Sequence, residues 1–464
     1  MLGKAPRWVV DSGALACILA GAAVLFRRDL RVPPSFDEGV YLAQTDALLH
    51  GQRLGIDVFA AQPPGFHWLL LGAAWAGGLG VNQLRLAVMA LALIGVGAAY
   101  WLGRTLAGPA AGLAAAAVLV VAKPYPTFAA QVSADLPGTA LALAALACAI
   151  GAGRRWPRLA AGGLLFAAAE TVKLDAFILL LPVPIYVAIR RITLAEIGAF
   201  AGAAVVALGA GAAVVGGALP DVWRGAVSYH VAARSAAGGS DNGHQLVAFF
   251  QWRQPVTWLT AAAAACACVV RPSFRLPVWP FWVMAAAATG FVLWHQPLHD
   301  NHLVLLSVAF AVPVGVTLVS AVAHAGRFST LATAALVVVL CAGYYQDTRQ
   351  LNRNAAPLPA VIKWAAVQVD TIAKPNQLVV SDEPLVPFLA HRRMPGSTID
   401  TALLRFDTGY LTDADVLQAI DRHDVRVVVA ARAFLSRPSL LSAFADRFGS
   451  PRIRDGMRIY AAKP

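Results

Sequence analysis

Charged residues are scarce in this chain. Only 13% of its 464 residues are charged and 58% are hydrophobic, whereas soluble globular proteins have roughly 25% and 45–50%. The composition therefore excludes an ordinary soluble protein. Because the apolar residues gather in runs close to the roughly 20 residues that span a bilayer, we expect a polytopic membrane protein.

Cysteines are also few, and all five lie inside apolar stretches without the spacing to His or carboxylate residues that a metal site needs. This pattern excludes a disulfide framework and a zinc site. We expect these residues to pack between helices: Cys17, Cys148, Cys266, Cys268 and Cys341.

The chain also lacks a basic patch interleaved with aromatic residues, although its net charge is +12. Arginines recur singly or in pairs between apolar runs, which indicates membrane topology and not nucleic-acid binding. No small-residue cleavage site follows the first apolar run, which ends at Arg27 and Arg28. We therefore expect an uncleaved first helix.

The apolar runs within 1–345 predict an all-α polytopic membrane domain of about 11 transmembrane helices. Basic residues occupy every second connection, as the positive-inside rule requires of cytoplasmic loops. The expected spans are 8–26, 84–103, 110–122, 135–152, 159–172, 174–189, 195–217, 256–270, 277–294, 302–323 and 329–345. The basic connections carry Arg104, Arg154, Arg155, Arg158, Arg190, Arg191, Arg271, Arg275 and Arg327.

Segment 63–80 is apolar enough to be a further span, but it begins with Pro-Pro and is rich in glycine, so we place it in the membrane interface. Arg27, Arg28 and Arg31 then lie on the outer side, against the rule. If 63–80 does not cross the membrane, the remaining crossings place the polar connections on one non-cytoplasmic face. They are the first external loop (27–83), the turns at Asp135 and Lys173, the loop 218–255 and the segment 295–302.

Residues 346–464 have a different composition, with a dense mix of Asp, Arg and Pro. Short apolar strands are expected at 378–380, 425–430 and 457–461, and helices around 412–422 and 439–448. This segment is predicted to be a small soluble α/β domain. Eleven crossings from a cytoplasmic N-terminus place it outside the cell.

Asp37 and Glu38 stand side by side just after the first span. An apolar helical pattern follows them, so the pair is expected at the N-terminus of a helix that lies on the membrane. The plain alternative to a catalytic role is that both carboxylates only cap this helix and complement its dipole.

Lys173 lies between two apolar spans, beside Glu170 and Asp175. Charges so close to the bilayer are costly unless they are paired or used. Lys173 is therefore expected either to form a local ion pair or to contact a phosphate group.

The segment 295–302 contains His295, His299, Asp300 and His302. Such residues can hold a metal ion, but a loop without fixed helical spacing is weak evidence for one, and contacts to a phosphate or a sugar are favoured. His302 could instead bond a backbone carbonyl. The aromatic and polar loop 218–255 is typical of a sugar site or lid, or of an interfacial aromatic belt.

Three motifs follow in order: FDEGVY (36–41), QPPGFHW (62–68) and SADLPG (133–138). This set resembles the GT-C class of membrane glycosyltransferases, in the branch of the protein O-mannosyltransferases and the lipid A aminoarabinose transferases. The likeness is best over 30–150 and looser over the remaining spans. It implies a GT-C type membrane domain with a C-terminal soluble domain.

The resemblance also implies site residues. The catalytic carboxylate falls on Asp37, with Glu38 or Asp135 orienting the acceptor or a metal ion. Many relatives have a basic residue before Pro-Pro where this chain has Gln62, so the donor phosphate is assigned to Lys173, Arg85 and His302. The substrate-binding candidates are Tyr41, Gln62, His67, His295, His299 and Asp300. No residue is assigned to a metal, and a divalent cation stays an open alternative.

We therefore expect an integral-membrane glycosyltransferase that moves a sugar from a polyprenyl-phosphate donor to a glycan, lipid or protein acceptor, with Asp37 as general base and inversion at the sugar carbon. Its partners are the lipid bilayer, the donor and the acceptor, and not nucleic acid. The Ala-rich, Arg-over-Lys composition suggests a bacterial plasma membrane, with the active site on the extracytoplasmic face.

Two other classes of protein share this hydropathy but fit the polar residues less well. A transporter or lipid flippase would need charges near the bilayer midplane, whereas here they lie at span ends. A scaffold or receptor that acts through its soluble tail would leave the elaborate first loop without a purpose. The sequence does not separate arabinofuranose, mannose, glucose and galacturonic acid as the sugar.

The topology gives a first prediction: 63–80 does not cross the membrane, and 346–464 is extracytoplasmic. Gly80→Cys and Asp415→Cys should both be labelled in intact cells by a membrane-impermeant maleimide. The unsubstituted chain measures the background of its native cysteines. Labelling of either site only after permeabilisation would contradict the scheme.

Overall fold

The computed structural model of the protein describes residues 7–151, 156–190, 193–237, 242–250, 259–263, 265–266 and 272–462. The chain divides into two compact units, each assembled from three separate segments. Unit 1 comprises Met1–Val32, Arg85–Ala213 and Ser240–Ala355, and unit 2 comprises Pro33–Leu84, Val214–Gly239 and Ala356–Pro464.

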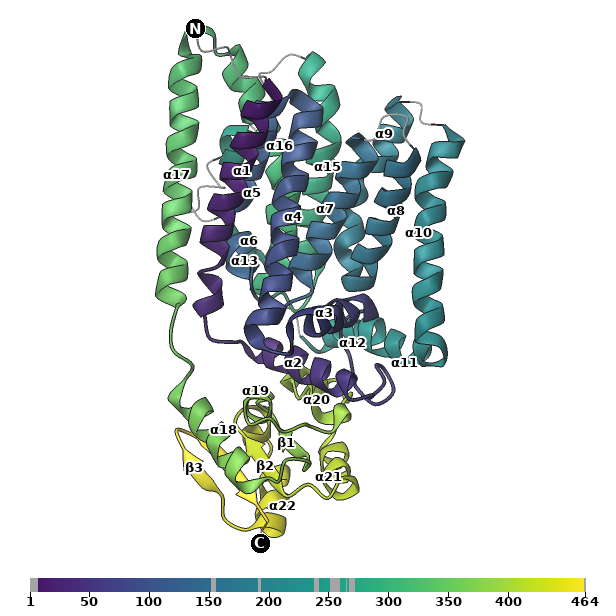
Figure 1. Ribbon diagram of the computed structural model, residues 1–464, viewed down its shortest axis with the longest axis vertical. Coiled ribbons are helices and arrows are strands. Elements are labelled where there is room, and N and C mark those ends of the chain that lie inside the picture. The colour runs from purple at the N-terminus through teal and green to yellow at the C-terminus, as the bar shows by residue number, and fades with distance from the viewer. Residues whose placement is uncertain are drawn as a thin grey trace. The chain divides into compact units, whose positions relative to one another are not determined.

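Unit 1 is a bundle of long helices that run side by side (Figure 1). Ten of the eleven expected spans coincide with helices, and the remaining one, 256–270, falls mostly outside the described residues. The elements are α1 (Arg7–Phe26), η1 (Asp29–Arg31), α4 (Val81–Ala107), α5 (Pro109–Val120), α6 (Pro124–Phe128), α7 (Asp135–Gly151), α8 (Trp156–Val172), η2 (Leu174–Leu180), α9 (Pro182–Arg190), α10 (Leu194–Val215), α13 (Asn242–Phe249), α15 (Pro272–Trp294), η5 (Asp300–Leu303), α16 (Val304–His324), η6 (Gly326–Phe328) and α17 (Ser329–Asn354).

Helix α16 forms the centre of unit 1. It contacts α5, α7, α15 and α17, and every residue from Val304 to Leu318 is buried. Gly315 allows α16 to approach α5, because a Cβ atom there would lie only 2.4 Å from the backbone nitrogen of Ala115. Small residues at such crossings are typical of helices that pack in membranes.

Four helical stretches within the described residues are long and apolar enough to cross a membrane, and several shorter apolar helices accompany them. The helix that covers the segment 63–80 is α3 (Pro64–Gly77), whose 14 residues extend about 21 Å at 1.5 Å per residue. The prediction of an all-α membrane domain followed by a small α/β domain is confirmed.

Unit 2 contains a four-stranded sheet in the order β1-β2-β4-β3. Strands β1 and β2 are parallel, and β4 pairs antiparallel with both β2 and β3. The elements are α2 (Phe36–Leu49), α3, η3 (Gly216–Ala218), α11 (Leu219–Trp223), the π-helical turn η4 (Arg224–Ser228), α12 (Tyr229–Ala236), α18 (Ala360–Ile372), β1 (Val379–Ser381), α19 (Leu385–Leu389), η7 (Gly396–Thr398), α20 (Leu403–Asp407), α21 (Asp413–Arg422), β2 (Val427–Ala430), η8 (Ala433–Ser436), α22 (Pro438–Phe448), β3 (Arg452–Arg454) and β4 (Met457–Ala461).

The first external loop belongs to the same unit as this sheet. Helix α2 packs against α19, and Gly39 makes this contact close, since a Cβ atom there would lie 2.9 Å from the backbone nitrogen of Leu385. Asp382 follows β1 and its carboxylate accepts hydrogen bonds from the backbone nitrogens of Ala431, Arg432 and Phe434. These bonds fix the ends of β1 and β2 to each other.

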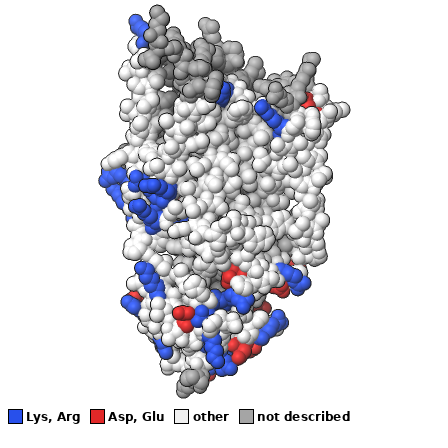
Figure 2. All heavy atoms as spheres, in the orientation of Figure 1, with Lys and Arg blue, Asp and Glu red and all other residues white. Residues whose placement is uncertain are grey.

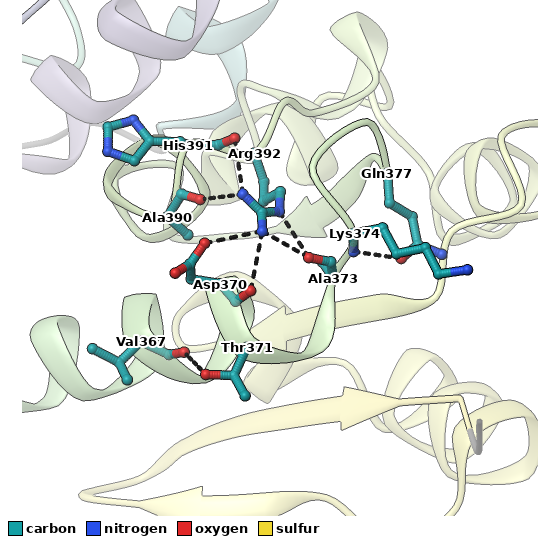
Figure 3. Close-up of polar contacts among 9 residues, drawn as sticks. All are labelled: Val367, Asp370, Thr371, Ala373, Lys374, Gln377, Ala390, His391 and Arg392. Carbon is teal, nitrogen blue, oxygen red and sulfur yellow. Dashed lines mark hydrogen bonds and ion pairs between the residues drawn. The ribbon is translucent and has the colours of Figure 1, made fainter.

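Arg392 holds the end of α18 in unit 2. Figure 3 shows its guanidinium pointing at the last turn of the helix, where it donates to the carbonyl oxygens of Asp370 and Ala373 and pairs with the Asp370 carboxylate at 2.9 Å. A further bond reaches the carbonyl of Ala390. A cation among the free carbonyls of a helix C-terminus is favourable both for hydrogen bonding and for the helix dipole.

This arrangement predicts that Arg392→Met destabilises the end of α18. The substitution leaves buried carbonyls without donors, at a cost of about 2 kcal/mol, so amides of α18 should exchange with deuterium about 30-fold faster. Hydrogen exchange of the full chain in detergent measures this. Arg393→Met, at the next position, should leave exchange unchanged; equal acceleration by both variants would refute the assignment.

Candidate functional site

The polar centre of unit 1 is a buried ion pair. Asp135 is the first residue of α7 and Lys173 occupies the turn between α8 and η2. The Lys173 Nζ lies 3.1 Å from Asp135 Oδ1, and the two residues are only 4% and 8% exposed. The sequence raised a local ion pair as one alternative for Lys173; the structure pairs it across helices with Asp135.

Two neighbours complete this pair. Asn301 donates from Nδ2 to Asp135 Oδ2 at 2.7 Å, so both carboxylate oxygens have a partner. Gly138, one turn further along α7, leaves room for Lys173, because a Cβ atom at Gly138 would lie 2.6 Å from the Lys173 Cβ. A helix N-terminus also favours a negative side chain such as Asp135.

Three histidines border the pair. The His302 ring lies at 4.5 Å from that of His295 and at 5.6 Å from that of His299, measured between ring centroids. The backbone nitrogen of His299 donates to His302 Nδ1, and His302 lies close enough to Asp135 for their charges to interact. Asp300 is exposed beside them. The structure therefore gathers Asp135, Lys173, His295, His299 and His302 in unit 1.

Arg85, near the start of α4, has a different environment. It is 1% exposed, and its Nη1 donates to the carbonyl of Val32 at 2.8 Å and more weakly to those of Asp29 and Leu30. The Nη1 of Arg85 thus bonds the chain where it leaves α1.

In unit 2, the adjacent acids of α2 have separate environments. Ser35 is the N-cap: its Oγ accepts from the backbone nitrogen of Glu38, while the Glu38 carboxylate accepts from the backbone nitrogen of Ser35. Glu38 is 1% exposed, whereas Asp37 is exposed. The capping alternative therefore describes Glu38, whereas the Asp37 side chain is exposed.

An aromatic group in unit 2 lies near Asp37. The rings of Phe59, Tyr229 and Tyr410 pack edge to face, with centroids 5.3 to 6.1 Å apart. Burial raises the pKa of the Tyr229 hydroxyl, and the negative charge of Asp37 is among the nearby groups that add to this effect. The Arg405 guanidinium covers the Phe59 ring at 3.9 Å, a favourable cation–π geometry. Aromatic faces beside a carboxylate suit a sugar-binding surface.

The remaining candidates of the first loop have packing contacts. Tyr41 meets the Phe66 ring edge to face at 4.8 Å. His67 is fully buried in α3, and burial lowers its pKa to about 4, so the ring is neutral near pH 7. Gln62 is half-buried at the start of this segment.

A cavity of about 480 Å³ also lies in unit 2, between α2, α3 and the segment 214–222. Gln52 and Arg53 give it a polar edge and Trp68 and Val222 an apolar wall. Within the described part of the chain, no group of three or more His, Cys, Asp or Glu has an arrangement that could hold a metal ion.

Comparisons with known proteins bear on this geometry. Residues 61–215 match the family model of the dolichyl-phosphate-mannose-protein mannosyltransferases. The fold is similar to that of ArnT from Cupriavidus metallidurans in the apo state, with a TM-score of 0.72 and 16% identity over 98% of this chain and 99% of that one. The chain has the GT-C fold.

Other solved structures agree. ArnT of Cupriavidus metallidurans bound to undecaprenyl phosphate matches with a TM-score of 0.71 and 17% identity, again over 98% and 99% of the two chains. The oligosaccharyltransferase of Archaeoglobus fulgidus in its apo form matches at 0.56 and 10% identity, over 89% of this chain and 69% of that one. No curated protein matches in sequence. The resemblance to GT-C glycosyltransferases is confirmed.

Several residues that contact the candidate site were not predicted from the sequence. Asn301 lies within the histidine segment and Gly138 within SADLPG, so both stood beside recognised motifs without a signal of their own. Phe59, Tyr410 and Arg405 come from segments about 350 residues apart, and no local pattern could have joined them.

The contact at Gly138 predicts that Gly138→Ala forces Lys173 away from α7. Overpacking of this kind costs about 1–3 kcal/mol, so the melting temperature of the detergent-solubilised chain should fall by several degrees. Gly97→Ala in α4 is the control, since a Cβ atom there meets nothing within 4 Å. A melting temperature that is unchanged in Gly138→Ala would contradict the tight approach.

Proposed function

We propose that this protein is an integral-membrane glycosyltransferase that transfers a sugar from a polyprenyl-phosphate donor to a cell-envelope acceptor on the extracytoplasmic face of the plasma membrane. The observation that carries the proposal is the near-complete overlap with an ArnT structure that holds undecaprenyl phosphate. The match of residues 61–215 to a family named for a dolichyl-phosphate sugar donor supports the same donor class.

The chemistry needs few groups. A polyprenyl-phosphate sugar carries its own leaving group, so the enzyme must deprotonate the acceptor hydroxyl and stabilise the released phosphate. Asp37 takes the proton as the acceptor oxygen attacks the sugar carbon, and the bond from that carbon to the phosphate oxygen breaks. Lys173 contacts the phosphate, with His302 beside it. In a site of low dielectric constant, one ammonium group attracts a phosphate strongly.

The structural roles of the neighbouring residues support this assignment. The Glu38 carboxylate accepts the hydrogen bond of the helix cap, and the Arg85 Nη1 donates to the carbonyl of Val32. Asp135 orients Lys173 through the 3.1 Å ion pair. The aromatic group of Phe59, Tyr229 and Tyr410 offers faces for the sugar or acceptor.

The transfer should invert the anomeric configuration. One carboxylate that deprotonates the acceptor supports a single in-line displacement, whereas retention needs a second carboxylate as nucleophile on the other side of the sugar. Glu38 is adjacent to Asp37 but points about 100° away on the helix and is buried in the cap. NMR of the product determines the anomer.

The class is tested by incubating the purified chain with radiolabelled polyprenyl-phosphate sugars and a cell-envelope extract, with and without EDTA to reveal a divalent-cation requirement. Label should pass to an envelope component. Movement of the lipid-linked sugar across liposomes without transfer would instead favour the transporter or flippase.

The mechanism predicts that Asp37→Asn, which keeps the shape and removes the base, lowers turnover by about 10²-fold or more while donor binding stays nearly intact. Asp46→Asn on the same helix, where Asp46 faces His50 at 3.2 Å, is the matched control and should retain turnover.

A variant of Lys173, in unit 1, distinguishes phosphate binding from proton transfer by Asp37. Lys173→Ala should weaken binding of the donor phosphate, measured as displacement of radiolabelled undecaprenyl phosphate. Near-normal turnover of Asp37→Asn in membranes would refute the base assignment and make Asp135 the next candidate.

A further inference from the structure

Six cations gather at one end of unit 1, apart from the Asp135–Lys173 pair. They come from three places in the sequence that the fold brings together, since α1, α6 and α17 contact one another. The Arg28 Nη1 donates to Asn352 Oδ1 at 2.7 Å, which ties the end of α1 to the end of α17. Figure 2 shows a blue cluster surrounded by white atoms, with other charged residues nearer the top and the bottom of the view. The patch consists of Arg27, Arg28, Arg31, Lys123, Arg349 and Arg353.

The patch carries few counter-charges. The acidic residues within the same elements, Asp29 and Asp347, are buried at 0% and 4% exposure. The Asp29 carboxylate accepts from the backbone nitrogen of Ala130 and the side chain of Gln131. Among the described residues, no ion pair within 4 Å engages a cation of the patch, and Asp347 interacts electrostatically with Lys123 at longer range. The positive charge of the patch is therefore available to an anion from outside the chain.

Membrane topology does not account for these cations. Helix α17 begins next to Arg327 and carries Arg349 and Arg353 at its far end, about 35 Å away at 1.5 Å per residue. Helix α4 shows the same two ends. Arg85, near its start, bonds the residues after α1 and so marks the end that carries the patch, whereas Arg104 lies in its last turn at the opposite end. Unit 1 is thus basic at both ends. The positive-inside rule expects basic residues only at the cytoplasmic end. Whichever end of unit 1 faces the cytoplasm, the basic residues at the other end are not explained by this rule.

The surface beside the patch is suited to lipid chains. Helix α17 exposes apolar side chains along its length, with Leu331 at 70% and Val338 at 64% exposure. Tyr345 is 61% exposed, and the Arg349 guanidinium lies 5.7 Å from its ring. An exposed Tyr between an apolar stretch and arginines marks the level of the lipid headgroups.

We propose that this patch binds the phosphate of an anionic phospholipid headgroup, with the acyl chains lying along α17. Arginine guanidinium groups donate to phosphate oxygens in a planar, paired geometry, and basic residues at a membrane boundary attract anionic lipids. The site is separate from the donor-phosphate contact proposed at Lys173 and does not depend on the transfer reaction.

The test titrates the purified full chain in a non-ionic detergent with dioleoylphosphatidylglycerol or dioleoylphosphatidylcholine and counts bound lipids by native mass spectrometry. The anionic lipid should bind at least tenfold more tightly, and R27Q/R31Q/R349Q/R353Q should abolish this preference. The matched control R422Q/R426Q/R452Q/R454Q removes the same charge from exposed positions of unit 2 and should keep it.

The proposal would be overturned if both fourfold variants lost the preference for the anionic lipid equally, or if the patch variant kept it. It would also be overturned if inorganic phosphate bound as tightly as the lipid, because the patch would then be a site for free anions. If the fourfold variant does not elute as the parent chain does in gel filtration, R27Q/R31Q and R349Q/R353Q decide, each expected to reduce the preference at least threefold.

Discussion

The buried contact between Asp135 and Lys173 constrains the rest of unit 1. Removing two charges from water costs several kcal/mol per ion, and only close pairing and further hydrogen bonds offset that cost. The start of α7 must therefore meet the turn after α8, and Gly138 and Asn301 serve this contact by leaving space and supplying a donor. The histidine segment is positioned around the same pair.

In unit 2, the cap of helix α2 gives the adjacent acids Asp37 and Glu38 different environments. The N-cap at Ser35 engages the Glu38 carboxylate and buries it, while Asp37, one residue earlier, stays exposed. The helix start thus gives two adjacent acids different exposure, with Glu38 buried in the cap and Asp37 exposed. The same turn positions Asp37 near Tyr229, whose helix follows a π-helical turn.

Helices and strands that are marked by a local pattern of apolar residues were predictable from the sequence. Hydropathy predicted the helices of unit 1, and short apolar runs predicted β1, β2 and β4 to within about two residues. The partners of particular side chains were not predictable, because they depend on contacts between distant segments. Lys173 had two acids beside it in sequence, yet its 3.1 Å partner is 38 positions away.

The same reason explains Arg85 and the aromatic group. Arg85 has a charge suited to a phosphate, but its Nη1 donates to backbone oxygens of the residues after α1. Phe59 and Tyr410 belong to the first loop and the C-terminal segment, and their packing reflects the assembly of unit 2 from three segments. Composition cannot report which parts of a chain share a core.

The contact between Gly39 and Leu385 has a consequence for the order of synthesis. These residues are roughly 350 positions apart, so at 5–20 residues per second the first loop waits about 20–70 s for its packing partner. During that time α2 presents an apolar face without α19. Biogenesis of this protein therefore needs a means of sheltering the early loop until translation ends, such as the membrane surface itself or a bound chaperone.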